Sequence, residues 1–167
     1  MSSQTAGESV DVALVRILID GYSLLHGWPE LAPGKARHSA AAREELIRKL
    51  TLYRDAIGTP ITVFFDGGGA PAGTHKHTST PEMEVLYSKR GQTADDMIER
   101  TTHRMVSYGE VLVVTDDYAE RDLVIGLGGM AQSCDQFLFA IGGARGDAKR
   151  DLENYNRRER NRYQQPR

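Results

Sequence analysis

Six aspartates stand where predicted secondary-structure elements begin or end. They are Asp20 after the apolar run 12–19, Asp66 after the run 61–65, Asp95 and Asp96 at the start of a predicted helix, and Asp116 and Asp117 after the run 111–114. In a parallel sheet, the carboxyl ends of the strands and the helices that follow them meet at one edge. The pattern therefore predicts a cluster of carboxylates at that edge.

Such a cluster has a definite chemistry. Carboxylates a few ångströms apart raise one another's pKa unless a positive charge lies between them. Oxygen ligands without a neighbouring His or Cys favour Mg²⁺ or Mn²⁺ over zinc, and these ions promote displacement at phosphorus. Each acid also has a simpler interpretation, because Asp-Gly pairs form turns after strands and aspartates cap helices. The residues taken singly leave both interpretations open.

Alternating strands and amphipathic helices are expected to position these acids. Short Val-, Ile- and Leu-rich runs are typical of strands buried on both faces, and apolar residues every three or four positions are typical of helices. The predicted strands are 12–19, 61–65, 84–87 and 111–114, and the predicted helices are 40–57, 94–107, 119–126, 133–141 and a charged one from about 147. Ser39 caps the first helix, and Thr93 with Asp96 forms a capping box on the second. This order predicts an α/β fold with three layers (α/β/α) and a central, mostly parallel sheet.

Length and composition restrict the class of protein. A chain of 167 residues, 40% hydrophobic and 26% charged, fits one globular domain. Its longest apolar runs are far shorter than the roughly 20 residues that cross a bilayer, so we expect no membrane partner. The single cysteine, Cys134, and the absence of a signal-like start predict a cytoplasmic protein.

The charge is unevenly distributed along the chain. The net charge is −2, yet residues 145–167 hold eight basic and four acidic side chains. A basic tail on an acidic body is compatible with a phosphate-rich partner, and equally with a solvated charged helix. We expect a disordered leader at 1–11, one α/β domain at 12–143, and a charged C-terminal helix with a basic tail at 144–167.

Five segments resemble a known family in order and spacing. They are Ile17–Ser23, Gly27–Leu31, Val63–Asp66, Gln92–Glu99 and Val113–Tyr118. Together they resemble the YacP-like branch of the NYN domains, within the PIN-like nuclease superfamily. The resemblance runs from about Val15 to Ile141, which is most of the chain. It implies a metal-dependent endoribonuclease, a hydrolase similar to a ribosome-associated enzyme that cuts mRNA in the A site.

The resemblance also implies roles for individual residues. Asp20, Asp66, Asp95 and Asp117 would be ligands of Mg²⁺ or Mn²⁺ and, with Asp96, the catalytic residues. Glu99 would support them from the helical face of Asp95, and Ser23 and Asp116 are further candidates for a supporting role. The family usually has Asn where this chain has Ser23, and Ser or Thr where it has Asp116. An in-line displacement assisted by one or two ions would leave a 5′-phosphate and a 3′-hydroxyl.

Basic and aromatic residues near the predicted edge are candidates for binding RNA. They are Lys76, Lys89, Arg90 and Arg121 for phosphates, and Tyr22, Trp28 and Tyr118 for stacking on unpaired bases. The expected partners are RNA, including mRNA, and the ribosome. Two alternatives stay open: a catalytically decayed RNA- or ribosome-binding module, for which Ser23 is the only hint, and a phosphatase acting on small nucleotides.

Overall fold

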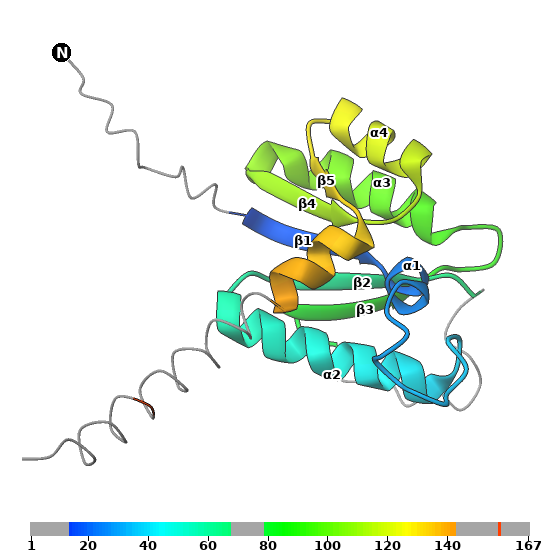
Figure 1. Cartoon of the computed structure of the whole chain (residues 1–167). Coiled ribbons are helices and arrows are strands. Elements are labelled where there is room, and N and C mark those ends of the chain that lie inside the picture. Colours follow the sequence, from blue (N-terminus) through cyan, green and yellow to red (C-terminus); the bar gives the residue numbers. More distant parts are fainter. Residues whose placement is uncertain (1–13, 68–78, 143–156, 158–167) are drawn as a thin grey trace, which may run out of the picture. The chain divides into compact units, whose positions relative to one another are not determined.

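The computed structural model describes residues 14–67, 79–142 and 157 (Figure 1). The chain divides into two compact units, Met1–Cys134 and Asp135–Arg167, which are described separately. The elements of the first unit are β1 (Leu14–Asp20), α1 (Gly21–His26), α2 (Ala40–Ile57), β2 (Ile61–Phe65), β3 (Met83–Tyr87), α3 (Ala94–Met105), the 3₁₀ turn η1 (Val106–Tyr108), β4 (Glu110–Val114), α4 (Tyr118–Gly126) and β5 (Met130–Gln132). A further helix covers residues 134–142, close to the predicted 133–141.

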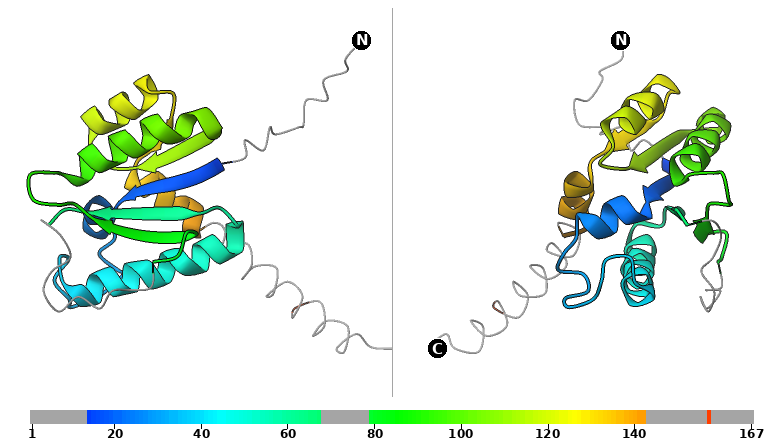
Figure 2. Two further views of the ribbon diagram at one scale, coloured as in Figure 1. Left: turned by 180° about the vertical axis from the view of Figure 1, so that it is seen from behind. Right: turned by 90° about the vertical axis from the view of Figure 1, so that its right-hand side faces the viewer.

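The sheet has five strands in the order β3-β2-β1-β4-β5, and all pairings between them are parallel. Helices α3 and α4 pack against each other on one face, whereas α1 and α2 pack together on the other (Figure 2). Leu18 and Phe64 of the sheet meet Ile98 of α3 and Val124 of α4 in one buried cluster. The predicted three-layer fold with a parallel sheet is confirmed.

The predicted caps of α2 and α3 are also confirmed, although α3 ends at Met105 and not at the predicted 107. The Ser39 side chain accepts from the backbone of Ala42, and Gly58 ends α2 with φ +74°, a conformation that favours glycine. Thr93 and Asp96 form the expected capping box of α3. These caps place the starts of α2 and α3 at the same edge of the sheet, because each helix runs back to begin the next parallel strand.

Two elements were not predicted. The sequence Asp20-Gly21 suggests a turn, but the Asp20 side chain accepts from the backbone of Ser23 and starts the six-residue helix α1. This helix is too short to show a helical period. Strand β5 has three residues, and its Met130 is exposed. Neither element carries the apolar pattern from which longer elements are recognised.

Several predictions lie outside the described residues. These are the leader at 1–11, most of the loop at 67–81 with Lys76, and the helix and basic tail at 144–167 apart from Arg157. Among the described residues, the structure contains no helix long and apolar enough to span a membrane.

Candidate metal centre

Asp20 is the last residue of β1 and the N-cap of α1. Because side chains alternate along a strand, it points to the same face of the sheet as Leu18, the face covered by α3 and α4. Ser23, one turn into α1, donates from its Oγ atom to Asp20 Oδ2 at 3.0 Å. The start of α1 thus fixes this carboxylate at the edge of the sheet.

Three carboxylates from three elements converge at this edge. One oxygen each of Asp20, Asp95 and Glu120 lie within 4.8 Å of one another. Asp95 lies in the first turn of α3 and Glu120 in the first turn of α4. The packing of α3 against α4 therefore brings two helix starts to the end of β1. No other such group of His, Cys, Asp and Glu side chains occurs within the described residues.

Thr115 connects two of these acids from the end of β4. It is fully buried, and its Oγ1 atom lies 3.0 Å from Glu120 Oε2 and 3.4 Å from Asp20 Oδ2. One hydroxyl proton serves only one acceptor at a time, and the shorter distance favours Glu120. The same oxygen accepts from the backbone of Asp117 at 3.2 Å.

Two acids of this cluster have raised pKa values. Burial raises the pKa of Glu120 to about 9, with the hydrogen bond to Asp95 and the charges of Asp95 and Asp20 as further causes. Burial also raises the pKa of Asp20, against the lowering effect of its hydrogen bonds from Ser23. Glu120 is only 5% exposed, and its Oε1 atom has no hydrogen-bond partner when the carboxyl is ionised.

A divalent cation fits this arrangement. The donor set consists of carboxylate oxygens, which suit Mg²⁺ or Mn²⁺. A positive charge among the three oxygens removes the repulsion that raises the pKa of Glu120, and it gives the buried Oε1 atom a partner. The residues present therefore match the metal that the sequence predicts.

The other predicted acids lie around this cluster and have structural partners of their own. Asp66 Oδ1 accepts from the backbone of Ala94 at 2.5 Å, and its charge contributes to the raised pKa of Asp20. Asp117 caps α4 through the backbone of Ala119 and Glu120. Asp96 belongs to the capping box, Asp116 accepts from the backbone of Cys134, and Glu99 lines a separate exposed depression on α3. Their catalytic roles stay predictions.

Glu120 and Thr115 are the residues that sequence reasoning missed. Glu120 follows the N-cap Asp117 by three residues, where a helix commonly carries an exposed acid. Its burial depends on the packing of α4 against α3, which no local pattern reveals. The available signal was its position at the start of a helix that follows a strand of the parallel sheet.

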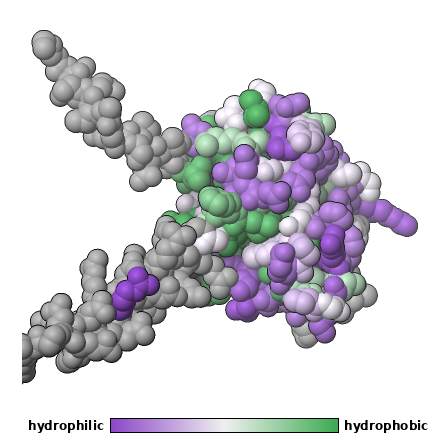
Figure 3. Space-filling model, in the orientation of Figure 1, coloured by the Kyte–Doolittle hydropathy of each residue, from purple (hydrophilic) through white to green (hydrophobic). Residues whose placement is uncertain are grey.

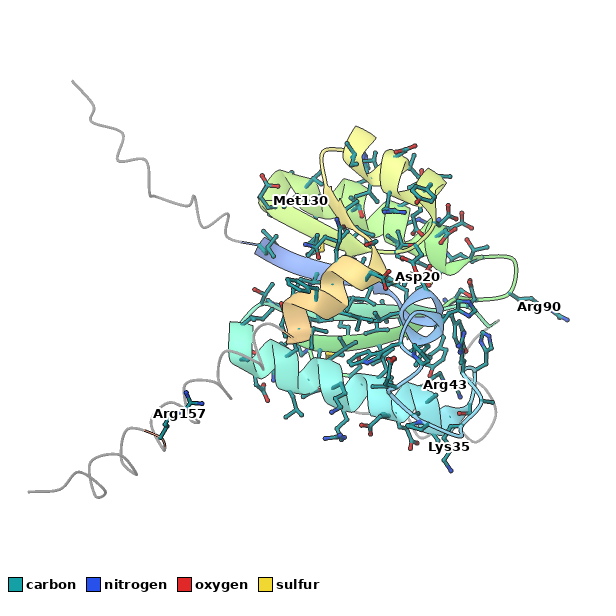
Figure 4. The ribbon with its side chains drawn as sticks, in the orientation of Figure 1. Asp20, Lys35, Arg43, Arg90, Met130 and Arg157 are labelled. Atoms are coloured by element: carbon teal, nitrogen blue, oxygen red, sulfur yellow. The ribbon has the colours of Figure 1, made fainter. Side chains whose placement is uncertain are left out.

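Some of the predicted RNA-binding residues are exposed, whereas others pack into the domain. Lys89 and Arg90 are exposed in the connection from β3 to α3, and Arg90 projects from the edge at which β1 and β2 end (Figure 4). Tyr118 is 77% exposed, and the Arg121 guanidinium lies 4.1 Å from the centre of its ring. Hydrophilic residues dominate the right-hand side of the molecule in Figure 3, the side on which β1 and β2 end. Tyr22, by contrast, is half-buried and packs against Phe65.

Comparisons with known proteins agree with this architecture. The protein-family model that describes the YacP-like NYN domain matches residues 17–166 of this chain. The uncharacterized protein YacP of Bacillus subtilis (strain 168) is 31% identical over 123 residues, 73% of this chain and 72% of that protein. A crystal structure of Rae1 (YacP) from Bacillus subtilis has a TM-score of 0.65 and 25% identity, covering 86% of this chain and 82% of that chain. The crystal structure of its tryptophan-to-leucine mutant has a TM-score of 0.66 and 26% identity, covering 84% of this chain and 82% of that chain.

Proposed function

We propose, from the premise that this chain belongs to the YacP-like NYN domain family, that it is a metal-dependent endoribonuclease acting on single-stranded RNA. Membership of this family supports a nuclease-like function on RNA. The observation that carries the finer proposal is the meeting of Asp20, Asp95 and Glu120, with the buried Oε1 atom of Glu120 accepting no hydrogen bond.

Asp20, Asp95 and Glu120 would hold Mg²⁺ or Mn²⁺. When bound, the cation supplies positive charge that stabilises the transition state at phosphorus and makes water a stronger nucleophile. The chain's own groups set the geometry: Ser23 orients Asp20 and Thr115 orients Glu120 through their hydroxyls. Asp66, Asp96 and Asp117 complete the proposed set of acids around the reacting phosphate.

The surroundings of the cluster suit a single RNA strand. Lys89 and Arg90 lie exposed beside the start of α3 and would contact phosphates. The exposed ring of Tyr118, backed by Arg121, would stack on an unpaired base next to Glu120. We extend the proposal to mRNA on the ribosome as substrate and to the cytoplasm as compartment, because the family resemblance and the single cysteine favour both.

The test is a cleavage assay with labelled single-stranded RNA and Mn²⁺, with and without EDTA. We expect cleavage that EDTA abolishes, and loss of cleavage in Asp20→Asn and Asp95→Asn. Asp122→Asn, the same change at an exposed position of α4, serves as the matched control. Full activity in both site variants would refute the assignment.

Two outcomes would support the alternatives. RNA binding without cleavage under any metal condition would indicate a decayed binding module. Hydrolysis of nucleoside monophosphates but not of RNA would indicate a phosphatase.

A further inference from the structure

A small cavity lies in the connection between α1 and α2, apart from the three carboxylates. Its volume is about 120 Å³. The buried side chains of Leu25, Leu31 and Ala42 line it, as does the half-buried Trp28. The exposed Lys35 and Arg37 also line it, together with Pro29, Ala32 and Gly34. We refer to this cavity as the Trp28 pocket.

The volume of the Trp28 pocket restricts what it can hold. It is well below the roughly 300 Å³ at which pockets for drug-sized ligands begin, and it is larger than the space that a single water needs. A single planar ring fits this range, whereas a complete small-molecule ligand does not. Most of the exposed lining is polar, and the indole of Trp28 offers such a ring a stacking surface.

The charges at the pocket favour an anionic chain attached to that ring. Lys35 and Arg37 are both cations, and none of the residues that line the pocket is acidic. Arg37 donates to Nδ1 of His26 at 2.9 Å, which holds its guanidinium beside the end of α1. An aromatic ring linked to phosphates is a nucleotide, and the arrangement is the usual one for single-stranded nucleic acid: stacking surfaces beside a basic track.

The Trp28 pocket lies at the same edge of the sheet as the metal centre. Asp20 caps α1 directly after β1, and Ser39 caps α2, which begins on the side of the molecule where β1 and β2 end (Figure 1). Leu25 follows Asp20 by five residues, which is roughly 7.5 Å along a helix axis. Figure 4 shows Asp20 and Lys35 toward the side on which β1 and β2 end. One strand of RNA can therefore reach both places.

We propose that the Trp28 pocket binds one unpaired nucleobase of the RNA substrate, with Lys35 and Arg37 contacting the neighbouring phosphates. The inference rests on the proposed ribonuclease function and deepens it. A base inserted beside Trp28 cannot be paired, so the pocket selects single-stranded RNA close to the cleavage site.

The first test uses Trp28 as its own reporter, because it is the only tryptophan of the chain. The full-length protein in EDTA is titrated with a short oligouridylate and with an abasic oligomer of equal length. We expect a saturable change of tryptophan emission with the oligouridylate alone. An unchanged emission while anisotropy of the labelled oligomer reports binding would overturn the proposal, and so would an equal response to both oligomers.

The second test removes the two cations at the pocket. Lys35→Ala with Arg37→Ala should weaken binding of the oligouridylate and reduce the slope of log affinity against log salt by about 1.4, or about 0.7 for each lost phosphate contact on a single strand. Arg48→Ala with Arg100→Ala removes the same charge from exposed positions on α2 and α3, and should leave the slope unchanged. Equal slopes in the two double variants would contradict the pocket's role.

The third test removes the stacking surface. Trp28→Ala should weaken binding about fivefold or more, the effect of losing one base–aromatic contact, whereas Trp28→Phe should retain most of it. Circular dichroism checks the fold of both. Binding that is unaffected in a folded Trp28→Ala would refute the proposal.

These tests separate the pocket from the proposed function. A protein that changes its emission with RNA but never cleaves RNA with Mn²⁺ keeps the Trp28 pocket and loses the nuclease. A protein that cleaves RNA with Mn²⁺ while its tryptophan emission stays constant keeps the nuclease function and loses the proposed role of the Trp28 pocket.

Discussion

Glu120 is a buried acid whose protonation is linked to the stability of the fold. Burial and the neighbouring Asp95 raise its pKa from 4.5 to about 9. Between these values the unfolded chain has released a proton that the metal-free folded chain still holds. The free energy of unfolding must therefore fall as pH rises through this window. We expect Glu120→Gln, which keeps the shape and removes the titration, to flatten this dependence in urea unfolding with EDTA.

The matched control for this prediction is Asp122→Asn on the same helix, which removes an exposed carboxylate and should keep the wild-type pH dependence. Identical pH profiles for the wild type and Glu120→Gln would contradict the placement of Glu120. The same variant should lose cleavage activity, because the amide keeps the volume of the side chain but supplies no negative charge for a cation.

Substitutions at Ser23 test whether Asp20 needs the Asn that the resembling family usually has at this position. Its Oγ donates to Asp20 at 3.0 Å, so the hydroxyl already positions this carboxylate. We expect Ser23→Ala to reduce cleavage about 10- to 100-fold, the usual cost of removing a partner of a ligand. Ser23→Asn should retain activity. A Ser23→Ala variant with wild-type rates at saturating Mn²⁺ and with an unchanged midpoint for Mn²⁺ would show that Asp20 needs no support.

Among the single residues of the cluster, Asp20 and Asp95 could be predicted from the sequence, because each lies directly at the end of a strand or the start of a capped helix. Glu120 and Thr115 could not be predicted. An acid three residues into a helix is common on exposed surfaces, whereas this one is buried where α4 packs against α3 and the ends of β1 and β4. A residue's role in the cluster thus depends on tertiary packing that local spacing does not encode.

Helix α1 depends on a close contact at its first residue. A Cβ atom at Gly21 would clash with the ring of Phe65 on β2. We expect Gly21→Ala to cost about 1–3 kcal/mol, the range for overpacking a core, and to displace the adjacent Asp20. Urea unfolding measures the first effect and the Mn²⁺ dependence of cleavage the second.

Gly126, at the end of α4, is the matched control, since a Cβ there meets no atom within 4 Å. Gly126→Ala should leave stability unchanged or raise it by up to about 1 kcal/mol, because alanine favours a helix. Equal stabilities of the two alanine variants would argue against the contact with Phe65.

Asp117 separates a helix cap from a metal ligand at the start of α4. Its Oδ1 accepts from the backbone of Ala119 at 2.9 Å. Asn caps helices about as well as Asp, whereas Ala loses roughly 0.5–2 kcal/mol. If Asp117 also serves the reaction, as the resemblance implies, Asp117→Asn keeps the melting temperature and cleaves about tenfold more slowly or worse. Full activity in that variant would leave Asp117 as a cap alone.

Elements were predictable where they were long enough to carry a period or a recognisable cap. Helices α2 and α3 have both, β2 is rich in β-branched and aromatic residues, and β4 holds the apolar run Val111–Val114. Helix α1 is too short to show a period, and the sequence Asp20-Gly21 suggests a turn more than a cap. Strand β5 has only three residues. Helix α1 forms because Asp20 caps it, and β5 forms because it can pair in parallel with Leu112–Val114 of β4. Both depend on neighbours that the local sequence does not specify.

The whole molecule should be more stable with its cation than without it. A ligand that binds only the folded state at about 100 times its dissociation constant adds roughly 2.7 kcal/mol to the free energy of unfolding. For a chain of this size that corresponds to a rise of about 5–11 °C in the melting temperature. We expect Mn²⁺ to produce such a rise, and Asp95→Asn to abolish it.

The size of this rise should depend on pH in a direction that the cluster fixes. The cation needs an ionised Glu120, whose pKa is raised to about 9 in the metal-free protein, so binding must release a proton. Mn²⁺ affinity, and with it the rise in melting temperature, should therefore increase as pH rises toward 9. Thermal melts over a pH series measure this, with Glu120→Gln as the variant that loses the dependence. A shift that is constant with pH, or equally large in Glu120→Gln, would place the cation away from Glu120 even if the protein cleaves RNA.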